Sequence, residues 1–328
     1  MFQIRSLFKK TMIWFMWYPF RILIRILPIQ ITYLLGITGG KLLYWTSKDK
    51  RKIIVEEMNC IFPSKHFGEI EDIIKQSFIN YVLSELEVLF YPTMNIELIN
   101  KMIVIEGKKH LDDAFSKGSG VLLFQAHFGA FQVVMPAIGY SGYKMNQVSA
   151  SASIWKEEVD LKIQKKSIDI KANYEKILPV KHISVDSSLR PVFRALERNE
   201  IVGITVDGGG GKKVLPLTFL GRTANFQKGA ADIALRTGAM IVPAFILTEK
   251  RFKHKLIIHP PLKTNRTGEK DDDIQRILTE FVKILEYYVY QYPCHYGYSL
   301  YLRKSRALQD PYPFFEDHLT TSKKDHIA

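Results

Sequence analysis

The sequence predicts an α/β fold, with a mostly parallel or mixed central sheet flanked by helices and an N-terminal helical segment that associates with a membrane. Three observations support this prediction. From about residue 101, short apolar runs alternate with helical patterns, which is typical of a sheet covered on both faces. Hydrophobic residues make up 47% of the 328 residues, enough for a sizeable core. The chain also opens with an aromatic, apolar stretch that arginines interrupt.

The N-terminal stretch has the composition of a segment that lies in a membrane interface. Its apolar residues are broken by Arg21 and Arg25, and Pro28 follows. A run of about 20 apolar residues, which a membrane-crossing helix needs, is therefore interrupted. Trp and Tyr are favoured at the headgroup boundary. We expect residues 1–40 to form an interfacial anchor; a single crossing and an aromatic-rich core helix are the alternatives.

The rest of the chain divides into a long helix, an alternating region and a tail. Apolar residues recur at helical spacing over residues 70–91, and Pro92 ends that helix. Strands are predicted over residues 102–106, 120–126, 143–149, 200–206, 240–247 and 255–258. Helices are predicted over residues 108–117, 130–139, 187–198, 228–237 and 272–290. Residues 41–310 thus form the predicted α/β domain, and residues 311–328 form a polar tail.

Charge and cysteine content limit the kinds of binding partner and cofactor that we expect. The net charge of +13 favours a negatively charged partner, such as an anionic membrane or an acidic protein. The sequence has no RNP-type motif and no zinc-finger spacing, so we expect no nucleic-acid partner. Two distant cysteines, Cys60 and Cys294, indicate a fold that does not depend on disulfides. No Cys/His cluster has metal-ligand spacing, so neither a metal nor a cofactor is expected.

His127 is the candidate general base. It directly follows the apolar run 121–126 and precedes a predicted helix, which places it at the edge of a sheet where ligands bind. Histidine side chains ordinarily titrate near neutral pH, which suits proton abstraction from an alcohol. Gln132, five residues later, is expected to fold back and hold the second ring nitrogen. The alternative is a buried histidine that backbone carbonyls satisfy. Asp207 also directly follows a predicted strand.

Residues 127–132, His-Phe-Gly-Ala-Phe-Gln, resemble the His-Phe-Gly-Asn-Trp-Glu signature of the lipid A biosynthesis lauroyl/myristoyl acyltransferases, part of the lysophospholipid acyltransferase superfamily. Further segments resemble this family in the same order, at residues 52–63, 188–196, 206–222 and 234–243. A single histidine motif is weak evidence, whereas five ordered matches are fairly specific.

The resemblance implies an O-acyltransferase of lipid A and lipopolysaccharide biosynthesis. Such an enzyme moves a fatty acyl chain from an acyl thioester, on acyl carrier protein or CoA, to a hydroxyl of a membrane glycolipid or lysolipid. His127 would deprotonate that hydroxyl. Acyl carrier protein is acidic, so the positive charge of the chain suits both this donor and an anionic membrane. The implied location is the cytoplasmic side of a bacterial inner membrane.

The chain departs from the family at Gln132, where the family has a carboxylate. A glutamine can accept a hydrogen bond from imidazole but cannot stabilise imidazolium by charge. We therefore consider that Asp207 supplies the missing charge; the alternative for Asp207 is a turn residue before the glycines. Two other functions stay open, namely a catalytically impaired homologue that binds lipid or acyl carrier, and a thioesterase.

Predicted substrate contacts lie in two parts of the sequence. Phe128 and Gly129 adjoin the histidine. The glycine run 208–211 is followed by Lys212 and Lys213 but lacks the spacing of a phosphate loop, so we predict that it brings lysines to a lipid phosphate. A plain flexible linker is the alternative. Arg222 is predicted to clamp an anionic headgroup or carrier phosphate.

Overall fold

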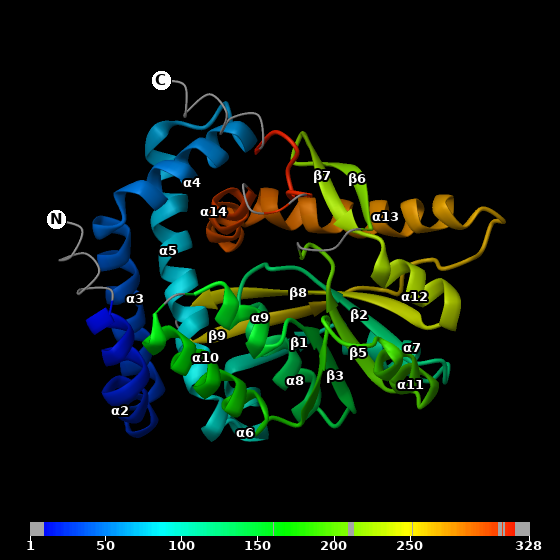
Figure 1. Ribbon diagram of the computed structural model, residues 1–328, viewed down its shortest axis with the longest axis horizontal. Coiled ribbons are helices and arrows are strands. Elements are labelled where there is room, and N and C mark those ends of the chain that lie inside the picture. The colour runs from blue at the N-terminus through cyan, green and yellow to red at the C-terminus, as the bar shows by residue number, and fades with distance from the viewer. Residues whose placement is uncertain are drawn as a thin grey trace.

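A seven-stranded sheet forms the centre of the computed structural model, which describes residues 10–159, 161–208, 213–250, 252–307, 310 and 312–318 (Figure 1). The strand order is β1-β9-β8-β2-β5-β3-β4. Neighbouring strands pair in parallel except β8 with β9, which are antiparallel. The strands of this sheet are β1 (Ile103–Glu106), β2 (Val121–Gln125), β3 (Met145–Ser149), β4 (Val180–Ser184), β5 (Ile201–Thr205), β8 (Met240–Lys250) and β9 (Lys253–Ile258). The predicted α/β class with a mostly parallel, mixed central sheet is confirmed.

Helices cover both faces of the sheet because its central strands are buried on both sides. In β2, Leu122 and Phe124 belong to one hydrophobic core, whereas Val121 and Leu123 belong to another. Since side chains alternate along a strand, the two cores lie on opposite faces. The helices are α2 (Arg21–Ile26), α3 (Ile29–Thr46), α4 (Lys48–Ile61), α5 (Phe67–Leu89), α6 (Ile96–Met102), α7 (Lys108–Phe115), α8 (Val134–Tyr140), α9 (Ala152–Glu157), α10 (Lys162–Glu175), α11 (Arg190–Glu197), α12 (Gly229–Thr237), α13 (Lys270–Gln291) and α14 (Gly297–Arg306), with the short helical turns η1 (Met16–Phe20), η2 (Tyr91–Thr93), η3 (Phe131–Val133) and η4 (Pro293–His295).

The alternation of the sequence located six of these seven strands to within a few residues. Strand β4 was not predicted, because it lies at the edge of the sheet and exposes Lys181 and His182, which breaks the apolar run. A separate antiparallel hairpin, β6 (Val214–Phe219) with β7 (Arg222–Gln227), was also not predicted. The predicted helix at 130–139 begins instead as the 3₁₀ turn η3, and α8 follows it.

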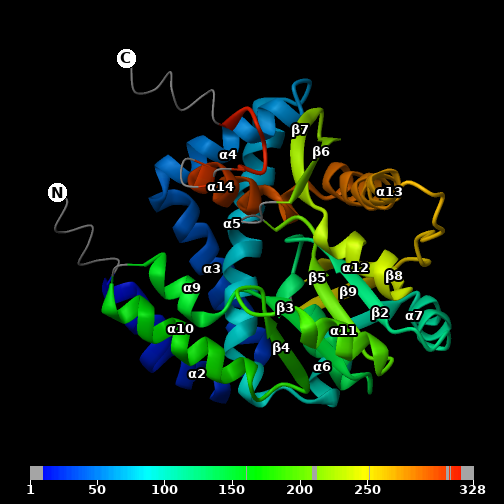
Figure 2. The same cartoon turned by 45° about the vertical axis from the view of Figure 1, so that its right-hand side comes forward.

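The N-terminal residues form helices that pack onto α5 and α10. Helix α3 lies along α5, and a Cβ atom at Gly40 would be only 2.5 Å from the Cα of Ile79. Arg21 and Arg25 of α2 donate to the hydroxyl of Tyr174 in α10, so these helices lie side by side (Figure 2). No helix in the described ranges is both long and apolar enough to span a membrane.

Residues 312–318 fall within the predicted polar tail, but two of their aromatic side chains pack inside the molecule. Phe314 and Phe315 are buried. Phe315 forms an antiparallel β-bridge with Ala224 of β7. The carbonyl of Phe314 accepts a hydrogen bond from the backbone amide of Asn225 at 2.7 Å. This segment, which we call the strap, therefore adds to the edge of the hairpin.

Candidate active site

The register of two central strands brings His127 and Asp207 together. Strands β2 and β5 are parallel, and Gln125 lies opposite Thr205. His127 and Asp207 each follow two residues after the end of their strand, so they emerge next to each other at the carboxyl edge of the sheet. The backbone amide of His127 donates to both Asp207 oxygens, at 3.0 and 3.2 Å.

The imidazole of His127 is held by the same carboxylate. Its Nδ1 lies 2.9 Å from Oδ1 of Asp207, and its side chain is 39% exposed. The ring of Phe131 contacts the imidazole edge-on, with 5.0 Å between centroids. When Asp207 is ionised, Nδ1 must donate, which leaves Nε2 as the nitrogen that can take a proton.

Asp207 is fully buried and surrounded by donors. Besides His127, its Oδ2 accepts from the hydroxyl of Tyr296 at 3.0 Å and from Nη2 of Arg303 at 2.6 Å. Burial opposes ionisation, but the charges of His127 and Arg303 and the hydrogen bonds from His127 outweigh it and hold the pKa of Asp207 well below its usual range. A buried negative charge therefore lies directly behind the imidazole.

Gln132 does not make the contact that the sequence led us to expect. Its Oε1 accepts from Lys171 Nζ at 2.6 Å, and its Nε2 lies 3.3 Å from both Ser84 Oγ and Glu85 Oε1. The acceptor for the imidazole is Asp207 instead. The reason is local: η3 turns the ring of Phe131 toward His127 and directs Gln132 toward α5 and α10. Gln132 nevertheless lines the same pocket as His127.

The two predicted contacts beside the histidine have different positions. Gly129 lines the pocket and has a φ of 61°; a Cβ there would be 1.9 Å from the carbonyl oxygen of Ile246. Only glycine fits at this position. Phe128, by contrast, is 1% exposed and stacks on His295, so it is a core residue and the prediction of a substrate contact is wrong.

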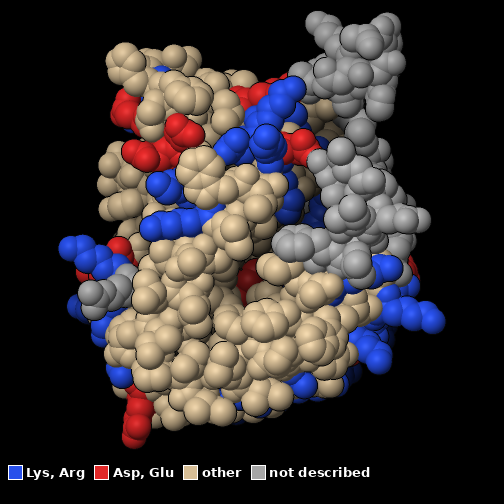
Figure 3. All heavy atoms as spheres, turned by 90° about the vertical axis from the view of Figure 1, so that its left-hand side faces the viewer, with Lys and Arg blue, Asp and Glu red and all other residues tan. Residues whose placement is uncertain are grey.

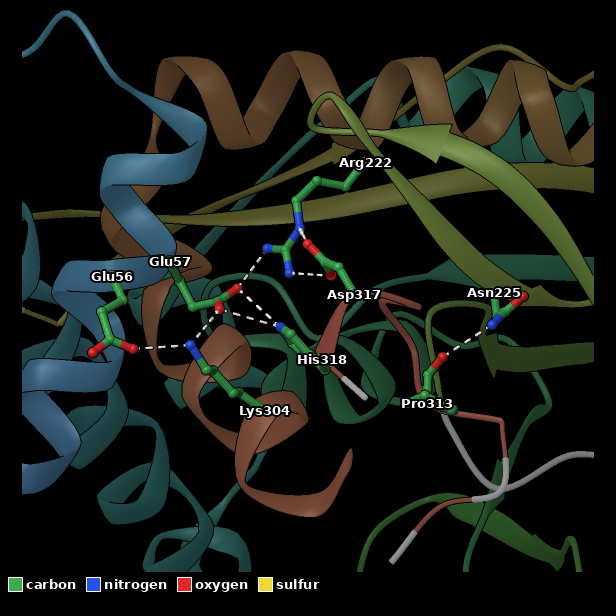
Figure 4. A network of polar contacts seen from close by, with 8 residues as sticks. All are labelled: Glu56, Glu57, Arg222, Asn225, Lys304, Pro313, Asp317 and His318. Atoms are coloured by element: carbon green, nitrogen blue, oxygen red, sulfur yellow. Dashed lines mark hydrogen bonds and ion pairs between the residues drawn. The ribbon is translucent and has the colours of Figure 1, made fainter. Parts of the chain in front are cut away.

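The predicted basic contacts lie elsewhere. Arg222 pairs with Glu57 and Asp317, at 2.6 Å each, and its side chain is only 12% exposed, so its donors are used within the protein (Figure 4). The prediction that it clamps a substrate is therefore wrong. Lys213 is exposed and does not line the pocket. Lys212 lies outside the described residues.

The pocket around His127 has a volume of about 190 Å³ and is completed by elements that the sequence did not point to. Helix α5 contributes Tyr81 and Glu85, and α14 contributes Arg303 and Arg306. The strap contributes Phe314. The basic C-terminal half of α14 was the one sequence signal that could have drawn attention to this wall. In the parts of the chain that the structure describes, no group of three or more His, Cys, Asp or Glu residues could hold a metal ion.

Comparisons with known proteins extend these observations. A search of curated protein sequences finds no match. Among solved structures, the chain resembles the crystal structure of the 1-acyl-sn-glycerophosphate (LPA) acyltransferase PlsC from Thermotoga maritima, with 15% sequence identity and a TM-score of 0.36, covering 79% of this chain and 97% of that chain. The sequence model of the family described as bacterial lipid A biosynthesis acyltransferase matches residues 1–300. The chain therefore belongs to the bacterial lipid A biosynthesis acyltransferase family, and it is an acyltransferase that acts on lipid substrates.

Proposed function

We propose that this protein transfers a fatty acyl chain from an acyl thioester to a hydroxyl of a membrane glycolipid or lysolipid, with His127 as the general base. The observation that carries the proposal is the 2.9 Å contact between His127 Nδ1 and the buried carboxylate of Asp207. This contact fixes the tautomer and presents Nε2 as the base.

The reaction follows from this arrangement. Nε2 removes the proton from the acceptor hydroxyl while the oxygen attacks the thioester carbonyl. A C–O bond forms, and the C–S bond breaks as the tetrahedral intermediate collapses. The imidazolium returns its proton to the leaving thiolate, so the imidazole is regenerated. Asp207 stabilises the imidazolium between these steps, because it is a negative charge held in a buried site.

Asp207 also bears on the alternative of an impaired homologue. That alternative rests on Gln132, which has no charge to stabilise imidazolium. Because Asp207 provides a carboxylate at Nδ1, the chain does not need one at position 132. This favours an active transferase over a protein that only binds lipid or acyl carrier.

The donor and the location belong to the same proposal. The net charge of +13 suits acyl carrier protein, with acyl-CoA as the alternative donor, and it suits anionic lipid on the cytoplasmic side of an inner membrane. The proposed reaction requires no resident cofactor, because the acyl group arrives already activated as a thioester. The N-terminal part of the described chain exposes large apolar side chains at Trp14, Phe15, Ile22, Leu23, Ile26, Leu34, Leu42 and Trp45. Seen from the side of α2 and α3, the surface is largely uncharged below a central hollow with acidic atoms inside it (Figure 3).

The test is acyl transfer from labelled acyl carrier protein or acyl-CoA to a lipid extract, with products separated by mass spectrometry. The wild-type chain should form an esterified lipid, and His127→Ala should form almost none. His182→Ala, which alters an exposed histidine of β4, is the matched control and should keep full activity. Release of free fatty acid without any lipid product would instead identify a thioesterase, and binding without turnover would identify an impaired homologue.

A further inference from the structure

Arg303 connects the catalytic pair to the C-terminal end of the described chain. Its Nη2 donates to Asp207 Oδ2 at 2.6 Å. Its guanidinium carbon also lies over the ring of Phe314, 3.7 Å from the ring centroid. The side chain is 9% exposed. A planar cation is thus held between a carboxylate and an aromatic ring, an arrangement that fixes its orientation.

The strap, residues 312–318, holds Phe314 in place through contacts with β7. The Asn225 side chain donates to the carbonyl of Pro313 at 3.0 Å (Figure 4). The backbone amide of Asn225 donates to the carbonyl of Phe314. The amide of Glu316 donates to the carbonyl of Thr223 at 3.2 Å. These bonds fix the backbone on both sides of the aromatic ring.

The end of the strap and helix α14 are anchored to one buried carboxylate. Glu57 of α4 lies 2.6 Å from Arg222, 3.3 Å from Lys304 and 3.2 Å from His318 (Figure 4). Burial would raise the pKa of Glu57, but His318 and Arg222 outweigh it and lower the pKa to about 2. Because Lys304 follows Arg303, the same anchor fixes both the helix that carries Arg303 and the strap that covers it.

We infer that Phe314 of the strap is part of the active site, because it holds Arg303 as a positioning residue against Asp207. The inference rests on the proposed function of the His127–Asp207 pair. The family model matches residues 1–300, so the strap lies outside the matched part of the chain. Pro313 and Phe314 also line the pocket, so the strap closes one of its walls.

Loss of Arg303 should have a specific signature. With Arg303→Gln, Asp207 loses a charged partner, and kcat should fall about 10- to 100-fold, the range for a hydrogen bond to a charged group. Removal of the cation also favours the protonated imidazole, so the acid limb of the kcat/KM profile should move to higher pH. Arg303→Lys keeps the charge and should restore part of the loss.

The strap is tested by Phe314→Leu in the full chain, which keeps an apolar side chain but removes the ring beneath the guanidinium. We expect kcat to fall about 3- to 30-fold, the worth of a cation–π contact, with KM for both substrates within about twofold and the acid limb shifted as for Arg303→Gln. Tyr312→Ala, at an exposed position of the strap, is the matched control and should retain activity. The other titratable groups facing the site are unchanged in these variants, namely Tyr81, Glu85, Cys294, His295, Tyr296, Tyr298, Arg306 and Asp310.

The outcomes separate this inference from the proposed function. If wild-type protein transfers acyl chains but Phe314→Leu behaves like Tyr312→Ala, the strap has no positioning role. A rise in KM alone, with kcat and pH profile unchanged, would also overturn the inference, because it would show only a lining role. If Phe314→Leu does not fold, Asp317→Asn loosens the strap at an exposed ion pair and should shift kcat and the acid limb in the same direction. Absence of transfer by wild-type protein would instead contradict the proposed function.

Discussion

The carboxylate of Asp207 accepts hydrogen bonds from the backbone amide and the imidazole Nδ1 of His127. It also accepts from Tyr296 and Arg303. An amide at this position would keep the shape of the side chain but lose the charge. In a Ser-His-Asp triad, the corresponding change costs about 10⁴-fold in kcat. At the residue scale, the proposed mechanism therefore depends on one buried charge behind an accessible imidazole.

We predict that Asp207→Asn lowers kcat for acyl transfer at least about 100-fold, because the amide favours the wrong imidazole tautomer and cannot stabilise imidazolium. The measurement is the steady-state rate with labelled acyl thioester and lipid acceptor. Asp113→Asn, at an exposed position on α7, is the control and should leave the rate unchanged. An Asp207→Asn variant with normal turnover would remove Asp207 from the mechanism.

Gln132 leads to the opposite prediction. Gln132→Glu would restore the residue type that the related signature carries, but the imidazole already has Asp207 as its acceptor. The new carboxylate would be attracted by the ammonium group of Lys171. It would also be repelled by Glu85, whose oxygen lies 3.3 Å from the present amide nitrogen. These two effects oppose each other, so kcat should stay within about threefold of wild type. A rise of tenfold or more in the same assay would show that position 132 limits the enzyme.

At the scale of elements, the N-terminal helix α3 packs closely against the long helix α5. The Cβ of an alanine at Gly40 would be 2.5 Å from the Cα of Ile79, which is backbone and cannot move aside. At the neighbouring Gly39, a Cβ would be 3.7 Å from a methyl carbon of Val82, which is ordinary contact. The two adjacent glycines therefore form a matched pair for measuring how firmly α3 is held.

We predict that Gly40→Ala destabilises the protein by about 1–3 kcal/mol, since the helices must separate to admit the methyl group. Gly39→Ala should be neutral or stabilising by up to about 1 kcal/mol, because alanine is the better helix former. Thermal unfolding of both variants, monitored by circular dichroism, tests this. Equal melting temperatures would mean that the α3–α5 contact is looser than the structure shows.

At the scale of the whole molecule, exposed large apolar side chains recur along residues 14–45. At opposite ends of this region, the side chain of Trp14 is 50% exposed and that of Trp45 is 63% exposed. Large exposed apolar surfaces mark interaction sites, and tryptophan prefers the membrane boundary.

We predict that the double change Trp14→Ser and Trp45→Ser weakens binding to vesicles of anionic and zwitterionic phospholipid at least about tenfold, because burial of each aromatic side chain contributes about 1.5–3 kcal/mol. Co-sedimentation with the vesicles gives the measurement. Val104→Ser, at an exposed apolar position of β1, is the control and should bind like wild type. Equal binding by all three proteins would rule out this surface as the membrane contact.

The sequence by itself determined the fold class, six strands of the sheet and the position of His127. These features depend on local patterns, since alternating apolar runs specify strands and helices, and a polar residue that directly follows a buried strand must emerge at the edge of the sheet. The exposed edge strand β4 and the hairpin β6–β7 escaped because their partly exposed residues give no such pattern.

Only the tertiary structure decided which residue supports the histidine. Position 132 was the expected partner because it is near in sequence, yet Asp207 is the partner, 80 residues away, because the register of β2 with β5 places it there. In the same way, Arg222 was predicted to clamp a substrate and the strap to be part of a polar tail, but Arg222 pairs with Asp317 of the strap. Register and packing are set by the whole chain at once, and a one-dimensional pattern does not contain them.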